Sequence, residues 1–120
     1  MNEPHAPLNM DRSLRVVIET AGMDWERSPA AGVWRKKLER AGSESGLVTS
    51  VVRYEPGSTF AEHAHPLGEE IFVLAGVFAD EHGEYPAGTW IRSPHGSMHA
   101  PFTRSDGALV YVKVGHLPGQ

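Results

Sequence analysis

The sequence of 120 residues contains no cysteine. This absence excludes disulfide bonds, thiolate metal sites and cysteine nucleophiles, so any metal must be held by nitrogen and oxygen ligands. The sequence also lacks a long apolar run. No segment approaches the roughly 20 residues that a membrane-spanning helix needs, and residues 1–14 contain no apolar signal core. We therefore expect a cytoplasmic protein with no membrane partner.

Positive charge is also scarce. The chain has 11 Lys and Arg against 15 Asp and Glu, which gives a net charge of −4 at pH 7 with neutral histidines. The basic residues form no stripe, and the short run Arg35, Lys36 and Lys37 is soon followed by Glu39. This distribution argues against nucleic acid as a partner.

Short apolar and β-branched runs separated by glycine and proline dominate the chain, which has 13 Gly and 9 Pro. The expected strands are residues 14–18, 33–38, 47–54, 60–65, 70–75, 77–80, 89–92, 99–102 and 108–114. Residues 33–38 also suit a short helix. We expect residues 1–13 to form a flexible N-terminal arm and residues 14–120 a single domain. Many short strands without a helical period predict an all-β fold, an antiparallel sandwich or barrel.

Histidine and glutamate cluster at the end of the expected strand 60–65 and just after it. His63 and His65 lie two residues apart, so in a strand both imidazoles project from the same face. Glu69 and Glu70 follow a turn, and the alternation of faces cannot be carried through that turn, so either carboxylate could join them. His99 follows a turn rich in glycine and proline. Imidazoles with one carboxylate suit zinc, iron, manganese, nickel or copper better than calcium.

These residues match two motifs in spacing, and the chain therefore resembles the cupin superfamily. The first motif, G-x5-H-x-H-x3,4-E-x6-G, is matched by Gly57, His63, His65, Glu69 and Gly76. The second, G-x5-P-x-G-x2-H-x3-N, is matched by Gly88, Pro94, Gly96 and His99, with Thr103 in place of the usual asparagine. The resemblance implies a single cupin β-barrel, a double-stranded β-helix or jelly roll. It also favours Glu69 over Glu70 and implies a metal site of His63, His65, Glu69 and His99.

Residues 33–114 further resemble the cupin domain of ChrR-type anti-sigma factors, which implies zinc as the metal and, as in many cupins, a homodimer. Those regulators bind the sigma factor through a separate cysteine-containing domain. We therefore expect a stand-alone cupin module without anti-sigma activity.

The function we expect is a metal-binding domain with a sensory or small-molecule-binding role. The alternative is a non-haem Fe(II) dioxygenase that cleaves diketone or hydroxyaryl ketone substrates, and the sequence leaves open whether the protein is an enzyme. A third reading is a metal that only ties strands together. Arg53 and Tyr111 are candidate walls of the cavity, where they could hold an anionic group.

Overall fold

The computed structural model describes residues 6–42 and 46–119, and within them almost all regular structure is β-strand. The elements are η1 Thr20–Gly22, β1 Glu26–Arg27, β2 Val33–Arg40, β3 Val48–Tyr54, β4 His63–Ala64, β5 Glu69–Asp80, β6 Gly83–Pro86, β7 Trp90–Ser93, β8 Met98–His99 and β9 Ala108–Val114. No helix in the described part of the chain is long and apolar enough to cross a membrane.

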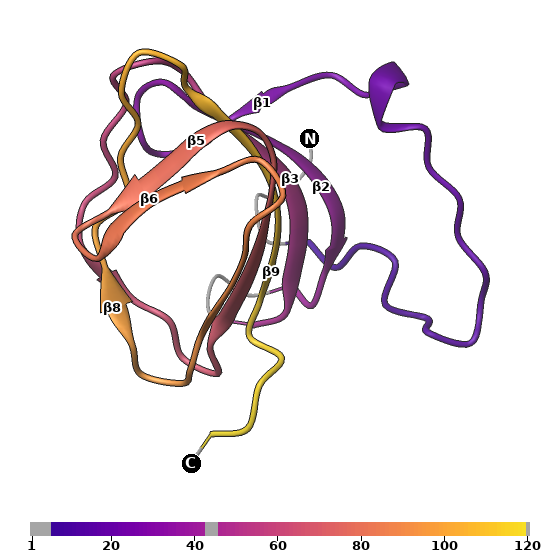
Figure 1. Ribbon diagram of the computed structural model, residues 1–120. Helices are drawn as coiled ribbons and strands as arrows, with labels where there is room; N and C mark the ends of the chain where they lie inside the picture. The colour runs from indigo at the N-terminus through magenta and orange to yellow at the C-terminus, as the bar shows by residue number, and fades with distance from the viewer. Residues whose placement is uncertain (1–5, 43–45, 120) are drawn as a thin grey trace.

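The strands form a curled antiparallel sheet and a small ribbon that faces its interior (Figure 1). The order in the large sheet is β1-β2-β3-β9-β5-β6, and β7 also pairs with β5. The ribbon consists of β4 and β8. The two sheets do not close into one continuous ladder within the described residues. The predicted all-β jelly-roll fold is confirmed.

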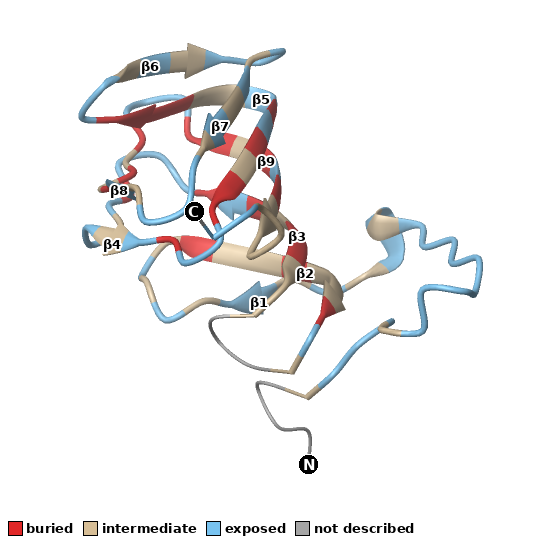
Figure 2. Ribbon diagram, turned by 90° about the horizontal axis from the view of Figure 1, so that it is seen from below, coloured by how far each residue is buried: buried red, intermediate tan, exposed pale blue. Residues whose placement is uncertain are grey.

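The core lies on the concave face of the large sheet because β3, β5 and β9 alternate apolar inward residues with outward ones. Figure 2 shows this alternation as red buried segments along the strands. The least exposed core side chains include Val33, Val73, Phe78 and Val110, each no more than 2 % exposed. The interior is therefore walled mainly by β-branched residues, which suit a pleated, half-buried surface.

Several predicted strands are confirmed, and others need correction. The segments 70–75 and 77–80 form one strand, β5, and of the predicted strands 60–65 and 99–102 only residues 63–64 and residue 99 lie in a strand. The strand β6 was not predicted. Residues 108–114 form β9 as predicted, and residues 33–38 lie in β2 rather than in a helix. Residues 14–18 do not form a strand. They run in an excursion outside the sheet (Figure 1), and Leu14, Val16 and Val17 are exposed. β-Branched residues favour an extended backbone, but a strand also requires a neighbouring strand to pair with, and this segment has none within the described residues.

Gly76 explains how β5 can pass so close to the turn before β9. Its φ is +73°, a conformation that side chains rarely adopt, and a Cβ there would collide with the carbonyl oxygen of Gly107. Val77 N donates a hydrogen bond to that same oxygen at 2.9 Å. The last glycine of the first motif therefore serves the packing of two strands rather than the chemistry of the site.

Candidate metal centre

The four predicted ligands lie in or directly after three strands, β4, β8 and β5, that meet at one point of the interior. His63 on β4 and His99 on β8 are direct cross-strand partners. His65 follows β4, and its backbone is held to the turn before β8, since His65 N donates to Ser97 O and Gly96 N donates to His65 O, both at 3.1 Å. Glu69 begins β5. Backbone pairing therefore brings together residues that are far apart in the sequence.

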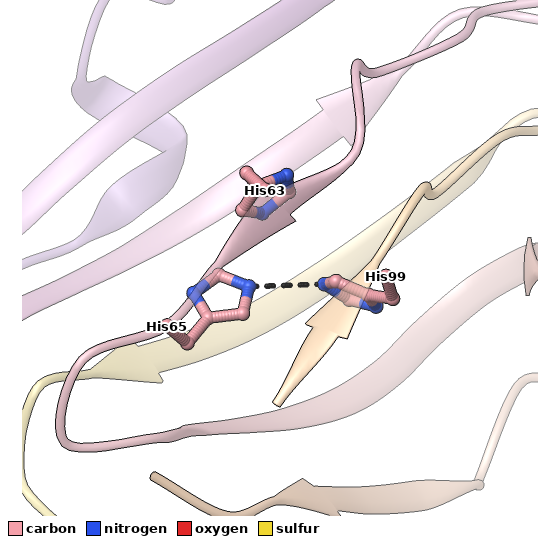
Figure 3. A group of neighbouring side chains, drawn as sticks. All are labelled: His63, His65 and His99. Atoms are coloured by element: carbon pink, nitrogen blue, oxygen red, sulfur yellow. Dashed lines mark hydrogen bonds between the residues drawn. The ribbon is translucent and has the colours of Figure 1, made fainter. Parts of the chain in front are cut away.

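The imidazole rings of His63, His65 and His99 point toward one another (Figure 3). One ring nitrogen from each of the three histidines lies within 4.8 Å of the others. His65 Nε2 and His99 Nε2 are 3.0 Å apart, and Glu69 Oε1 is 3.2 Å and 3.1 Å from them. Two ligand atoms about 2.1 Å from an ion, at right angles, would be about 3 Å apart. These separations fit one shared ion.

The buried carboxylate of Glu69 is the observation that most favours an ion at this point. Glu69 is 7 % exposed, and its buried Oε1 lies 3.2 Å and 3.1 Å from Nε2 of His65 and Nε2 of His99 without forming a hydrogen bond of acceptable geometry with any described residue. A buried carboxylate oxygen without a partner is costly. A cation among His65, His99 and Glu69 would satisfy this oxygen and the lone pairs of both Nε2 atoms. The donor set therefore fits a divalent transition metal.

In His63 and His99, the Nδ1 atom of the ring contacts an oxygen of a neighbouring residue. His63 Nδ1 donates to Ala61 O at 2.8 Å, and His99 Nδ1 lies 3.4 Å from Asp80 Oδ2. Asp80 is itself buried, and its Oδ1 accepts a hydrogen bond from the Tyr85 hydroxyl at 3.0 Å. Such partners fix the tautomer and direct the other nitrogen toward a metal. Sequence reasoning missed Asp80, because no local spacing links it to His99.

The pKa values of these side chains follow from burial and from their contacts with one another. Burial alone would raise the pKa of Glu69, but the imidazoles of His65 and His99 outweigh it and hold the pKa at about 2. Burial would lower the pKa of His99, but Glu69 and Asp80 outweigh it and raise the pKa. Burial lowers the pKa of His63. Glu69 is therefore ionised and ready to bind a cation across the physiological pH range.

Glu70 does not join this group, because it projects from the opposite face of β5. Its carboxylate accepts a hydrogen bond from Arg92 Nε at 2.7 Å and lies 2.6 Å from His116 Nε2. These partners, His116 first, lower the pKa of Glu70. The structure thus places the two adjacent glutamates in separate clusters.

Thr103, which stands where the second motif usually has asparagine, is 4 % exposed and fully engaged. Its hydroxyl donates to Glu55 O at 2.7 Å and accepts a hydrogen bond from Ser58 N at 3.1 Å. The shorter side chain thus ties the turn after β8 to the segment after β3, and the departure from the motif leaves the ligands in place.

A cavity of about 370 Å³ opens beside the site, and His63, His65, Glu69 and His99 all belong to its wall. Most of the remaining wall is apolar. Arg53 and Tyr111, the two candidate wall residues from sequence, do not line this cavity. Arg53 is exposed and lies over the rings of Trp25 and Trp34, with distances of 5.0 Å and 5.8 Å to the ring centroids. Both residues occupy exposed, outward positions of their strands.

The fold and site place the chain in a known family. Residues 13–118 match the model of the ChrR cupin-like domain, and the chain belongs to that family. Among curated proteins, no sequence matches it.

Solved structures with similar folds carry different activities. The chain is similar to Rhodobacter sphaeroides ChrR, from its complex with SigE, with a TM-score of 0.65 and 22% identity over 80% of this chain and 50% of ChrR. It thus spans about half the length of ChrR. An acetylacetone dioxygenase from Acinetobacter johnsonii gives a TM-score of 0.73 and 18% identity over 88% of this chain and 77% of that one. The polyketide cyclase RemF from Streptomyces resistomycificus gives a TM-score of 0.69 and 19% identity over 84% of this chain and 78% of that one. At these identities the likeness shows the fold alone.

Proposed function

We propose that the chain is a metal-binding cupin in which His63, His65, Glu69 and His99 hold one divalent ion, and that it binds a small molecule beside that ion in a sensory role. The observation that carries the proposal is the convergence of Nε2 of His65, Nε2 of His99 and Oε1 of Glu69 within 3.2 Å at the wall of a mostly apolar cavity. Membership of the ChrR cupin-like family favours zinc.

The protein's own residues would orient the site and exclude water from it. Ala61 O and Asp80 hold the second nitrogens of His63 and His99, so their Nε2 atoms face the cavity. The apolar wall lowers the local dielectric and favours an apolar ligand body. A bound zinc ion would act as a Lewis acid toward an oxygen of the ligand.

The second candidate is a non-haem Fe(II) dioxygenase acting on diketones or hydroxyaryl ketones. It is supported by the cavity beside the three imidazoles and by the fold shared with an acetylacetone dioxygenase. Iron would supply oxygen chemistry, while the apolar wall would hold the substrate body.

Metal analysis combined with oxygen uptake separates these candidates. The protein is made in zinc-rich and in iron-rich medium, and its metal content is measured. Oxygen consumption is then followed with acetylacetone and with a panel of hydroxyaryl ketones. Stoichiometric metal with no oxygen uptake in either form supports the sensory role. Rapid uptake by the iron form alone supports the dioxygenase, and absence of stoichiometric metal in both preparations contradicts the whole proposal.

We also propose that a second copy of the chain is a partner, through the outer face of the large sheet. Four exposed apolar side chains gather there, Phe72, Leu74, Trp90 and Tyr111, between 38% and 55% exposed. Phe72 pairs with Tyr111 on one side and with Trp90 on the other, so the patch is continuous. Such patches are typical of protein interfaces.

A further inference from the structure

The cavity beside the metal centre has a second polar region, which we call the arginine pole, formed by Arg35, Arg40 and Ser50. All three side chains line the cavity, from β2 and β3. Arg40 is 2% exposed and Ser50 is 1% exposed. Charged side chains are rarely buried to this degree, and here two guanidinium groups and a hydroxyl belong to the wall of one mostly apolar cavity.

The register of the sheet separates the arginine pole from the metal centre. Arg40 pairs with Val48, Val48 with Val114, and Val114 with Glu69, so Arg40 and Glu69 lie in one row, three strand spacings apart. That is about 14 Å along the sheet, which curls so that both side chains face the same interior. Valine side chains at the intervening positions form the wall between them.

Ser50 provides an independent indication that this pole receives a ligand. Its hydroxyl is buried and has no hydrogen-bond partner among the described residues. A buried hydroxyl without a partner costs free energy that a polar ligand atom in the cavity would recover. An oxygen anion could accept the hydrogen bond that this hydroxyl has available.

The charge of the wall favours an anion. Among the described residues that line the cavity, Glu69 contributes the negative charge of one carboxylate, and Arg35 and Arg40 contribute two positive charges. A divalent ion at the metal centre would more than neutralise Glu69 and leave the lining positive. Guanidinium groups bind carboxylates through two parallel hydrogen bonds, and this geometry is stronger and more selective than a point charge.

We propose that the cavity binds a small carboxylate with an apolar body, held by its carboxylate at Arg35, Arg40 and Ser50 and facing the metal centre with its other end. This inference rests on the proposed function, since the same cavity serves both. It narrows the ligand class from small molecules in general to carboxylates with a second oxygen, such as oxo-carboxylates. The size of the cavity, about 370 Å³, suits a compact molecule of this kind.

The test compares matched charged and neutral probes on the zinc-loaded full chain. Linear oxo-carboxylates of about five to eight carbons and their methyl esters are titrated by calorimetry. The account predicts that at least one carboxylate binds about tenfold or more tightly than its ester. Equal affinity of acid and ester throughout the series, or binding of neither, overturns the inference.

Three variants locate the effect. Arg40→Lys keeps the charge but loses the bidentate fork, and Ser50→Ala removes only the hydroxyl; both should reduce the preference for acid over ester. Arg53→Gln, on the outer side of β3, is the matched control and should leave it unchanged. Circular dichroism checks that each variant folds. If Arg40→Lys unfolds, the comparison of acid with ester on the unaltered chain and Ser50→Ala still decide the question.

Zinc content and the spectrum of a cobalt-substituted sample separate this inference from the proposed function. If the protein holds no metal, the proposed function fails whatever the probes do. If it holds metal and acetylacetone changes the cobalt spectrum, but acids bind no better than esters, the arginine pole alone is refuted.

Discussion

Two clusters of carboxylate and imidazole lie back to back on β5, and they differ chiefly in what surrounds them. On the inner face, Glu69 meets His65 and His99, and its Oε1 forms no hydrogen bond of acceptable geometry with any described residue. On the outer face, Glu70 has Arg92 and His116 at 2.7 Å and 2.6 Å. Similar residue types therefore form a hydrogen-bonded ion pair on the outer face, whereas on the inner face they form the cluster that we propose holds a cation.

The difference also shows in solvent contact. The side chains of Glu70, His116 and Arg92 are 21%, 17% and 57% exposed, whereas those of His65, Glu69 and His99 are each no more than 8% exposed. Exposed ion pairs contribute little to stability, since water and salt screen them. Only the inner cluster has the burial and convergence that can hold an ion. The predictions below set the two clusters against each other, from the largest expected effect to the smallest.

Loss of one inner imidazole should have the largest effect. His99→Ala removes a ligand and should weaken zinc binding by more than about 100-fold, because loss of even an indirect partner of a ligand costs about 10–100-fold. His116→Ala, on the outer face, should change the zinc affinity less than about threefold. Competition titration with a chromogenic chelator measures both. Equal losses in the two variants would show that the inner cluster is not the metal site.

The two adjacent glutamates form a still closer pair of controls. Glu69→Gln keeps the size of the side chain and removes the charge, so zinc affinity should fall by about 100-fold. Glu70→Gln should leave zinc affinity within about threefold and lower stability by less than about 1 kcal/mol, as expected for an exposed pair. Chelator competition and thermal unfolding measure the two quantities. A stronger loss of zinc from Glu70→Gln would reverse the assignment.

Acidification should release the metal, since protons and the ion compete for the same imidazole nitrogens. Glu69 and Asp80 raise the pKa of His99 in the metal-free protein, so the proton competes at a higher pH than on an ordinary histidine. Apparent zinc affinity should fall by about tenfold or more per pH unit as pH drops through the histidine range. Titrations at pH 8, 7 and 6 measure this slope. A flat profile would contradict histidine ligation.

Substitution of Asp80, whose carboxylate contacts His99 Nδ1, should have a moderate effect on zinc affinity. Asp80→Asn keeps the shape but weakens the hold on His99 Nδ1, and zinc affinity should fall by about tenfold. Glu84→Gln, an exposed change on the neighbouring β6, is the control and should have no effect. If both variants bind zinc as the unaltered chain does, Asp80 serves packing alone.

Changes to the apolar outer patch should affect zinc least. Phe72→Ser with Trp90→Ser should shift the chain toward the monomer in sedimentation velocity while zinc affinity stays within about threefold. The conservative pair Phe72→Leu with Trp90→Phe should keep the association state. An unaltered chain that sediments as a monomer at high concentration would contradict the proposed homodimer.

The predictions that succeeded from sequence rest on local patterns. Residues 47–54 and 108–114 are rich in β-branched residues and end at turns, and they form β3 and β9. The motif spacing named His63, His65, Glu69 and His99, which line one cavity in the structure, and their role as metal ligands stays a prediction. Residues 14–18 share the composition of a strand but lack a partner, and only the three-dimensional arrangement reveals that lack.

Contacts across the fold could not be predicted. Asp80 reaches His99, and Arg40 shares an interior with Glu69, only because β2, β3, β9 and β5 curl around one cavity. The candidate wall arginine from sequence, Arg53, has the same side chain as Arg40 but projects from the other face of the sheet. Side chains of a strand alternate between the two faces of the sheet, so a shift of one residue moves a side chain from the interior to the outside. The bulge in β2 between Lys37 and Glu39 changes this alternation before Arg40.

Anomalous diffraction from crystals of the zinc-loaded protein, recorded at the zinc edge, tests the central claim most directly. The account predicts one strong peak about 2.0–2.2 Å from the three imidazoles of His63, His65 and His99 and from a Glu69 oxygen. A peak at Glu70 and His116 instead, or no peak near β4 and β8 in crystals with stoichiometric zinc, would contradict it.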